Sequence, residues 1–151
     1  MKRQPKVPSF AGLKPASPLC SRIKKANTSR NTRHEVALQN ELSELGLRFQ
    51  RNVGDVPGRP DIVFPKAHVA VFCDGDFWHG RKWNVLRRNL SRGTNAAYWC
   101  AKISRNMKRD EEITTRLRKS GWQVVRLWES DIKKNPRAVA MDLRRILRDR
   151  P

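Results

Sequence analysis

The spacing of apolar residues in the first half of the chain predicts one helix followed by three strands. After Thr32, apolar residues recur at helical intervals, which predicts a helix from about residue 33 to 45. Residues 47–53 alternate between apolar and polar side chains, as in a half-buried strand. Two short apolar runs follow at 61–64 and 69–73, separated by four turn residues, and this arrangement is typical of a β-hairpin.

The second half of the chain adds a long helix, one strand and a final helix. Helical periodicity runs from about residue 94 to 119, residues 122–128 indicate a strand, and Asn135-Pro136 opens a last helix. Residues 80–93 are predicted to be a long loop that becomes ordered only on binding. The resulting order, αβββαβα, favours a single α/β domain in which a central mixed β-sheet is flanked by helices.

Charge identifies the class of partner. The 151 residues carry a formal net charge of +19, which predicts a nucleic-acid partner because so positive a surface repels itself without a polyanion. Residues 1–20 are predicted to form a basic arm that is disordered without DNA, followed by one domain spanning 21–151. No apolar run is long enough for a signal peptide or a membrane span, so we expect a cytoplasmic protein. Charge alone favours a non-catalytic binder over an enzyme.

Two aspartates at the ends of the predicted hairpin strands suggest a metal site. If the turn is centred near Ala67 and His68, antiparallel pairing places Asp61 opposite Asp74. Like charges placed opposite one another are destabilising, so this pair would favour a cation, and carboxylate oxygens suit Mg²⁺. The alternative is that both aspartates only end their strands at solvent-exposed turns.

An aromatic pair and a histidine follow the second aspartate. Phe77, Trp78 and His79 stand after a strand end and before a basic segment. Exposed aromatic rings can wedge between base steps, and a neutral imidazole near a metal can accept a proton from an attacking water. The alternative is a small hydrophobic plug beneath a loop, with a structural histidine.

Polar residues interrupt the apolar face of the long helix. Asn106 and Asp110 share a helical stripe with apolar residues, and burying them is unfavourable unless they are used. They either point toward the metal centre or are solvated on a rotated helix. Glu35, at the third position after Thr32, has the spacing of a capping box and could serve the helix end, the site, or both.

Five groups of residues, in this order between about Ser21 and Ser130, resemble the Vsr (very short patch repair) mismatch endonucleases. They are PGRPDIVF at 57–64, VAVFCDGDFWHG at 69–80, Thr94-Asn95 with Tyr98-Trp99 and Lys102, Asn106 with Arg109-Asp110, and Gly121-Trp122 with Trp128-Glu129. Several motifs in the same order make the resemblance far more specific than any one of them.

The resemblance implies a restriction-endonuclease-like PD-(D/E)xK core and a Mg²⁺-dependent enzyme that nicks one strand 5′ to the thymine of a T·G mismatch. Such a mismatch arises when 5-methylcytosine is deaminated. By resemblance, Asp61 is the principal metal ligand, with the main-chain carbonyl of Cys73 beside the ion, and Asp74 lies where family members carry Asp or His. His79 matches the catalytic histidine. Glu35 and Asp110 match acids around the centre, and Phe77 and Trp78 match the wedge that enters the duplex.

The chain departs from the family where a structural zinc is usual. Asp76 and Ser130 replace two cysteine ligands, and the loop between residues 80 and 93 has neither Cys nor His, so no structural zinc is predicted. Basic residues in that loop are expected to contact DNA phosphates instead: Arg81, Lys82, Arg87, Arg88 and Arg92. Lys24 stands where a third, apolar wedge residue is expected, and is a further candidate for DNA contact. These departures leave strict T·G specificity open.

Two other functions compete with this interpretation. One is a PD-(D/E)xK nickase with different or no mismatch specificity, and the other is a non-catalytic basic DNA-binding module. The expected partner is double-stranded DNA with a mismatch, bound by a monomer associated with the bacterial nucleoid, and a mismatch-repair protein is a candidate further partner.

Overall fold

The computed structural model describes residues 12–13 and 31–150. Predictions about the arm of residues 1–20 and about Lys24 therefore concern positions outside the described residues, except for the two at 12–13. None of the described helices combines the length and the apolar character that crossing a bilayer requires.

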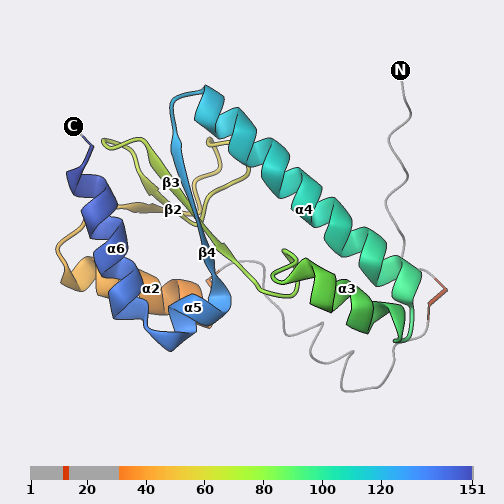
Figure 1. Ribbon diagram of the computed structural model, residues 1–151. Helices are drawn as coiled ribbons and strands as arrows, with labels where there is room; N and C mark the ends of the chain where they lie inside the picture. The colour runs from red at the N-terminus through yellow and green to blue at the C-terminus, as the bar shows by residue number, and fades with distance from the viewer. Residues whose placement is uncertain (1–11, 14–30, 151) are drawn as a thin grey trace.

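The element order confirms the α/β class with a mixed sheet flanked by helices (Figure 1). The described elements are α2 (Arg33–Glu44), β1 (Gln50–Arg51), β2 (Ile62–Phe64), β3 (Val69–Asp74), α3 (Trp83–Ser91), α4 (Ala96–Lys119), β4 (Gln123–Trp128), α5 (Glu129–Lys134) and α6 (Pro136–Arg148). The predictions for α2, the hairpin, α4, β4 and α6 each agree within about three residues, because each element has a strong apolar pattern and a clear cap or turn.

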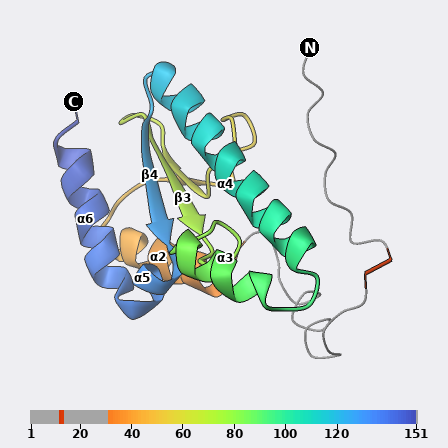
Figure 2. The ribbon, with the colours of Figure 1, turned by 45° about the vertical axis from the view of Figure 1, so that its right-hand side comes forward.

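The sheet has the order β1-β2-β3-β4 and separates two layers of helices. β1, β2 and β3 pair antiparallel, whereas β3 and β4 are parallel and are connected through α3 and α4. Helices α2, α5 and α6 cover one face of the sheet, and α4 crosses the other (Figures 1 and 2). The larger core lies on the α2 side and is centred on the fully buried Leu38, Ile62, Val71 and Ile132.

Two predicted segments were wrong, and one helix was missed. The strand expected over 47–53 is only Gln50–Arg51, at the sheet edge, where few partners stabilise it. The loop expected over 80–93 contains helix α3, which packs along α4 (Figure 2). Helix α3 has no fully buried residue and no side-chain cap at Lys82, so the usual sequence signals of a helix are weak. The short helix α5 was also not predicted.

The hairpin register differs by two residues from the one predicted. Ile62 pairs with Val71 and Phe64 with Val69, so Asp61 does not lie directly opposite Asp74. The four-residue turn is centred earlier than expected, and its last residue, His68, has a left-handed φ of 52° and donates its N–H to the Pro65 carbonyl. A shift of two residues keeps the same side chains on each face, so Asp61 and Asp74 remain on the same face of the hairpin.

Candidate active site

A cavity of about 470 Å³ lies at the carboxyl ends of the parallel strands β3 and β4. Its lining includes four carboxylates and one imidazole, from Glu35, Asp61, Asp74, Asp110 and His79. All five predicted catalytic residues therefore reach one cavity, although they come from α2, α4, β3 and the segments that flank the strands. The interpretation in which the two aspartates only end strands in solvent does not describe this arrangement.

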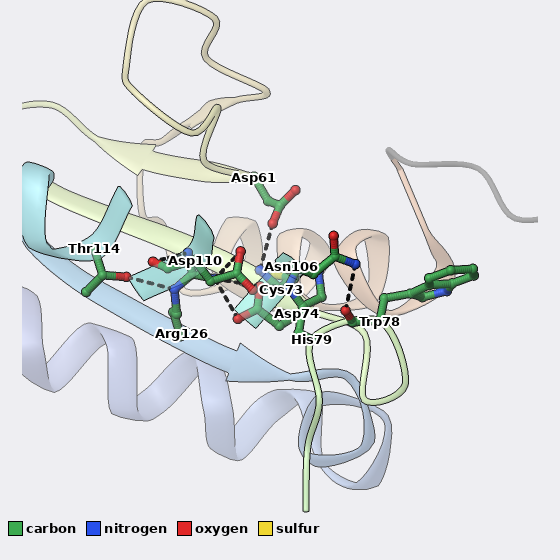
Figure 3. Close-up of polar contacts among 9 residues, drawn as sticks. All are labelled: Asp61, Cys73, Asp74, Trp78, His79, Asn106, Asp110, Thr114 and Arg126. Carbon is green, nitrogen blue, oxygen red and sulfur yellow. Dashed lines mark hydrogen bonds and ion pairs between the residues drawn. The ribbon is translucent and has the colours of Figure 1, made fainter. Parts of the chain in front are cut away.

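Asp61 is held by backbone groups immediately before β2. Its N–H donates to the Val71 carbonyl at 3.0 Å, and its Oδ2 accepts the Cys73 N–H at 2.6 Å (Figure 3). Burial raises the pKa of this carboxyl from 3.8 to about 7, although the Cys73 N–H lowers it, and the charges of Glu35 and Asp74 raise it further. An ionised Asp61 is therefore unfavourable without a cation nearby.

Replacing Asp61 with asparagine should stabilise the metal-free protein. Between pH 3.8 and about 7, Asp61 keeps its proton in the folded chain and releases it in the unfolded chain. Its contribution to the stability of the folded chain is therefore complete below pH 3.8 and is lost as the pH rises through about 7. At about 1.4 kcal/mol per pKa unit, the gain in unfolding free energy approaches at most about 4 kcal/mol at pH 8 and is smaller at pH 5. Thermal unfolding in EDTA at both pH values measures it, and equal stabilities at pH 8 would contradict it.

Glu35 adds a second buried carboxylate to the cavity. Its N–H donates to the Thr32 hydroxyl at 3.5 Å, as expected for a helix cap, but its side chain lines the cavity and is only 3% exposed. Its Oε2 is buried and has no hydrogen-bond partner among the described residues. A capping role therefore does not account for this oxygen, since a buried unpaired carboxylate oxygen is costly.

The carboxylates fit a hard cation that also binds substrate. No cationic side chain among the described residues forms an ion pair with Glu35 or with Asp61. Carboxylate oxygens of this kind suit Mg²⁺. Within the described residues, no three His, Cys, Asp or Glu side chains lie close enough to hold a metal by themselves. Mg²⁺ is usually bound through one or two carboxylates together with waters and substrate phosphates, so two free carboxylates suffice.

His79 is oriented by a carboxylate from α4. Its Nδ1 lies 2.5 Å from Asp110 Oδ2 and 3.6 Å from Asp74 Oδ1. Burial lowers the pKa of His79, but the hydrogen bond to Asp110 and the charges of Asp74 and Asp110 outweigh it, so the pKa lies above 6.5. Because an ionised carboxylate only accepts, Nδ1 donates to Asp110, and Nε2 remains to exchange a proton with a water.

Three arginines to which the sequence analysis assigned no role also line the cavity. Arg59 and Arg109 are exposed, whereas Arg126 is partly buried and binds both carboxylate oxygens of Asp74, at 3.0 and 2.8 Å. Asp74 is thus already neutralised by a side chain, unlike Asp61 and Glu35. One feature of the sequence could have identified Arg126: it is the only charged residue within β4, a parallel strand in which a charge needs a partner.

The aromatic residues form a cluster beside the cavity. The rings of Phe77, Trp78 and Trp99 lie 5.2 to 5.9 Å apart, and Phe77 remains 37% exposed. Asn106 donates to the Trp78 carbonyl at 3.0 Å, so it holds the segment that carries the rings, while the indole points away from the acidic residues (Figure 3). The packed rings resemble the predicted plug, yet one large ring still faces solvent.

Arg81 ties this aromatic segment to α5. Its guanidinium donates to the Ser130 hydroxyl and to Asp131 Oδ1, the latter at 3.1 Å, and Asp76 Oδ1 accepts the Ser130 N–H at 3.3 Å. Asp76 and Ser130, the two residues that replace the expected cysteine ligands, are therefore joined by one direct hydrogen bond. Arg81 is engaged within the protein, whereas Lys82, Arg87 and Arg88 are exposed around α3.

Comparisons with known proteins identify the family of this chain. The family model described as DNA mismatch endonuclease Vsr matches residues 19–85. The type II nicking enzyme V.NmeDIP of Neisseria meningitidis serogroup C is 43% identical over 125 residues, which are 83% of each chain. The type II nicking enzyme V.HpaIIP of Haemophilus parainfluenzae is 32% identical over 85% of this chain and 89% of its own. The DNA mismatch endonuclease Vsr of Escherichia coli strain K12 is 31% identical over 75% and 70%. The chain therefore belongs to the Vsr family of DNA endonucleases.

Proposed function

We propose that this protein is a Mg²⁺-dependent endonuclease that nicks one strand of duplex DNA 5′ to the thymine of a T·G mismatch. The observation that carries the proposal is the pair of desolvated carboxylates without a cation, Glu35 and Asp61, in one cavity with His79 and its partner Asp110. A net charge of +19 supports DNA as the substrate, which would locate the enzyme at the bacterial nucleoid.

Glu35 and Asp61 would hold the ion, with the Cys73 carbonyl beside it. When bound, Mg²⁺ would polarise a phosphate oxygen and lower the pKa of a bound water. His79 would accept the proton of the attacking water at Nε2, because Asp110 holds the other ring nitrogen. The exposed guanidinium groups of Arg59 and Arg109, which line the cavity, would contact the phosphates of the nicked strand.

The aromatic cluster would recognise the mismatch through the lower stability of the mismatched base pair. A mismatched pair costs less to unstack than a Watson–Crick pair, so a ring inserted beside it selects the site before any base edge is read. Phe77 is exposed and Trp78 is held by Asn106 and lies near Lys102 Nζ, 5.8 Å from the ring centre. The exposed Lys82, Arg87 and Arg88 would bind the flanking phosphates.

Nicking of three matched duplexes tests the function. Duplexes that differ only in T·G, T·A or C·G at one position are incubated with the protein and Mg²⁺, or with EDTA. We expect T·G to be nicked at least about tenfold faster, since about 1.4 kcal/mol of difference in unstacking gives that ratio, and no nicking in EDTA. Strand-specific end labels show whether the cut lies 5′ to the thymine.

A nickase without mismatch specificity is the second candidate function. The relatives named type II nicking enzymes favour it, because those names describe nicking. Equal rates on all three duplexes would select this candidate. DNA binding without cleavage of any duplex would instead select a non-catalytic module.

A further inference from the structure

Arg126 is surrounded by groups from β3 and α4. It lies across from Phe72 in the parallel register of β3 and β4, which directs it to the same face as Asp74. Its Nη1 donates to Asp74, its Nε donates to the Thr114 hydroxyl at 2.9 Å, and its Nη2 donates to the Asp110 carbonyl at 3.3 Å (Figure 3). Its Cζ lies 4.4 Å from the centre of the Phe72 ring.

These contacts fix two carboxylates at different distances from His79. Arg126 Nη1 lies 2.8 Å from Asp74 Oδ2 and 3.6 Å from Asp110 Oδ1. The same two carboxylates lie 3.6 and 2.5 Å from His79 Nδ1. Two like charges beside the same ring repel, and each could accept the imidazole N–H. A cation that pairs with one of the two carboxylates therefore selects the one that the ring contacts. By holding Asp74 with both oxygens, Arg126 leaves Asp110 as the acceptor.

We propose that Arg126 is a positioning residue for nicking: it pairs with Asp74 and anchors Asp110, so that His79 donates Nδ1–H to Asp110 and presents Nε2 to the cavity. This inference rests on the proposed function. It also divides the four acids into two pairs with different tasks. Asp74 and Asp110 are committed to orienting His79, and Glu35 and Asp61 remain for the cation.

A purely structural role for Arg126 predicts a different result. The stacking on Phe72 and the bond to Thr114 contribute to packing between β4 and α4, so a loss of stability alone does not distinguish the two roles. A positioning role changes the nicking step and the state of the His79 ring in protein that is still folded. Coupling between residues 126 and 74 can also be measured as the non-additivity of two substitutions.

The test compares Arg126→Met, Arg126→Lys, Asp74→Asn and the double variant Arg126→Met/Asp74→Asn. Single-turnover nicking and DNA affinity are measured for each, and Arg145→Met, an exposed arginine paired with Asp142, is the control for loss of one charge. The imidazole N–H of His79 is observed by NMR as a downfield, exchange-protected proton, assigned through its absence in His79→Gln. The double variant removes both buried charges, so it stays informative if Arg126→Met alone does not fold.

We expect Arg126→Met to slow nicking about 10²-fold, the cost of misplacing a reacting group by about 1 Å, with DNA affinity unchanged and the His79 signal lost. Arg126→Lys should recover only part of the rate, because an ammonium group keeps the positive charge but cannot reproduce the forked contacts. The double variant should be faster than the product of the single effects predicts. A double variant that matches that product, or an Arg126→Met protein with wild-type nicking and the His79 signal, overturns the proposal. If the wild-type protein nicks no duplex, the proposed function fails, and the NMR signal alone then supports or overturns the positioning role.

Discussion

Replacing Asp61 with asparagine should reduce nicking at least about 10³-fold, because the loss of several kcal/mol of charge stabilisation at the phosphate corresponds to that factor. Asparagine has nearly the same shape and its carbonyl oxygen can still accept the Cys73 N–H, so the cavity should persist. DNA affinity should remain close to that of the wild type, since phosphate contacts elsewhere dominate it. Single-turnover cleavage and gel-shift measurements on the same duplex separate the two effects.

Asp55→Asn provides the matched control for this substitution. Asp55 is an exposed aspartate in the turn that precedes Asp61, so the same change of charge there should leave nicking unaltered. If Asp61→Asn nicked at the wild-type rate in Mg²⁺, the cavity at the carboxyl ends of β3 and β4 would not be the active site. The measured cleavage would then have to arise elsewhere on the protein or from a contaminating nuclease.

Local patterns were enough to predict the elements that carry the site. Thr32 caps α2, which brings Glu35 into the first turn, and the apolar stripe of α4 identified Asp110 as a polar residue on a packed face. The same reasoning was least successful where a segment makes few buried contacts. Helix α3 has no fully buried residue, and β1 pairs only at the sheet edge, so neither has the periodicity from which an element is usually recognised.

Contacts between distant segments could not be predicted from spacing. The ion pair between Asp74 and Arg126 joins residues that are 52 positions apart, and it exists because β3 and β4 are parallel with Phe72 in register with Arg126. The two-residue error in the hairpin register had a different, local cause, since the left-handed backbone at His68 is set by turn geometry. The acidic residues and the histidine that line the cavity were therefore predictable, whereas the pairing of Asp74 with Arg126 required coordinates.

His79→Gln should reduce nicking by about 10²- to 10⁴-fold, the usual contribution of a positioned general base. Glutamine keeps a polar side chain of similar length, so the contact to Asp110 can be preserved while the titratable nitrogen is lost. The raised pKa of His79 also gives the wild-type enzyme a definite pH dependence. Below that raised pKa the ring is protonated and cannot accept a proton, so the rate should rise as the pH increases through it, and His79→Gln should lose that rise.

His68, a histidine outside the cavity, provides the control. His68 is exposed at the hairpin turn and stacks on Trp122, and asparagine tolerates its left-handed backbone, so His68→Asn should keep both the rate and its pH profile. A His79→Gln enzyme that retained the wild-type rise with pH would show that another group titrates in the rate-limiting step. One such group is Asp61, whose pKa of about 7 in the metal-free protein should fall once a cation is bound. Repeating the profile at several Mg²⁺ concentrations separates the two groups, because a midpoint that moves with the Mg²⁺ concentration belongs to Asp61.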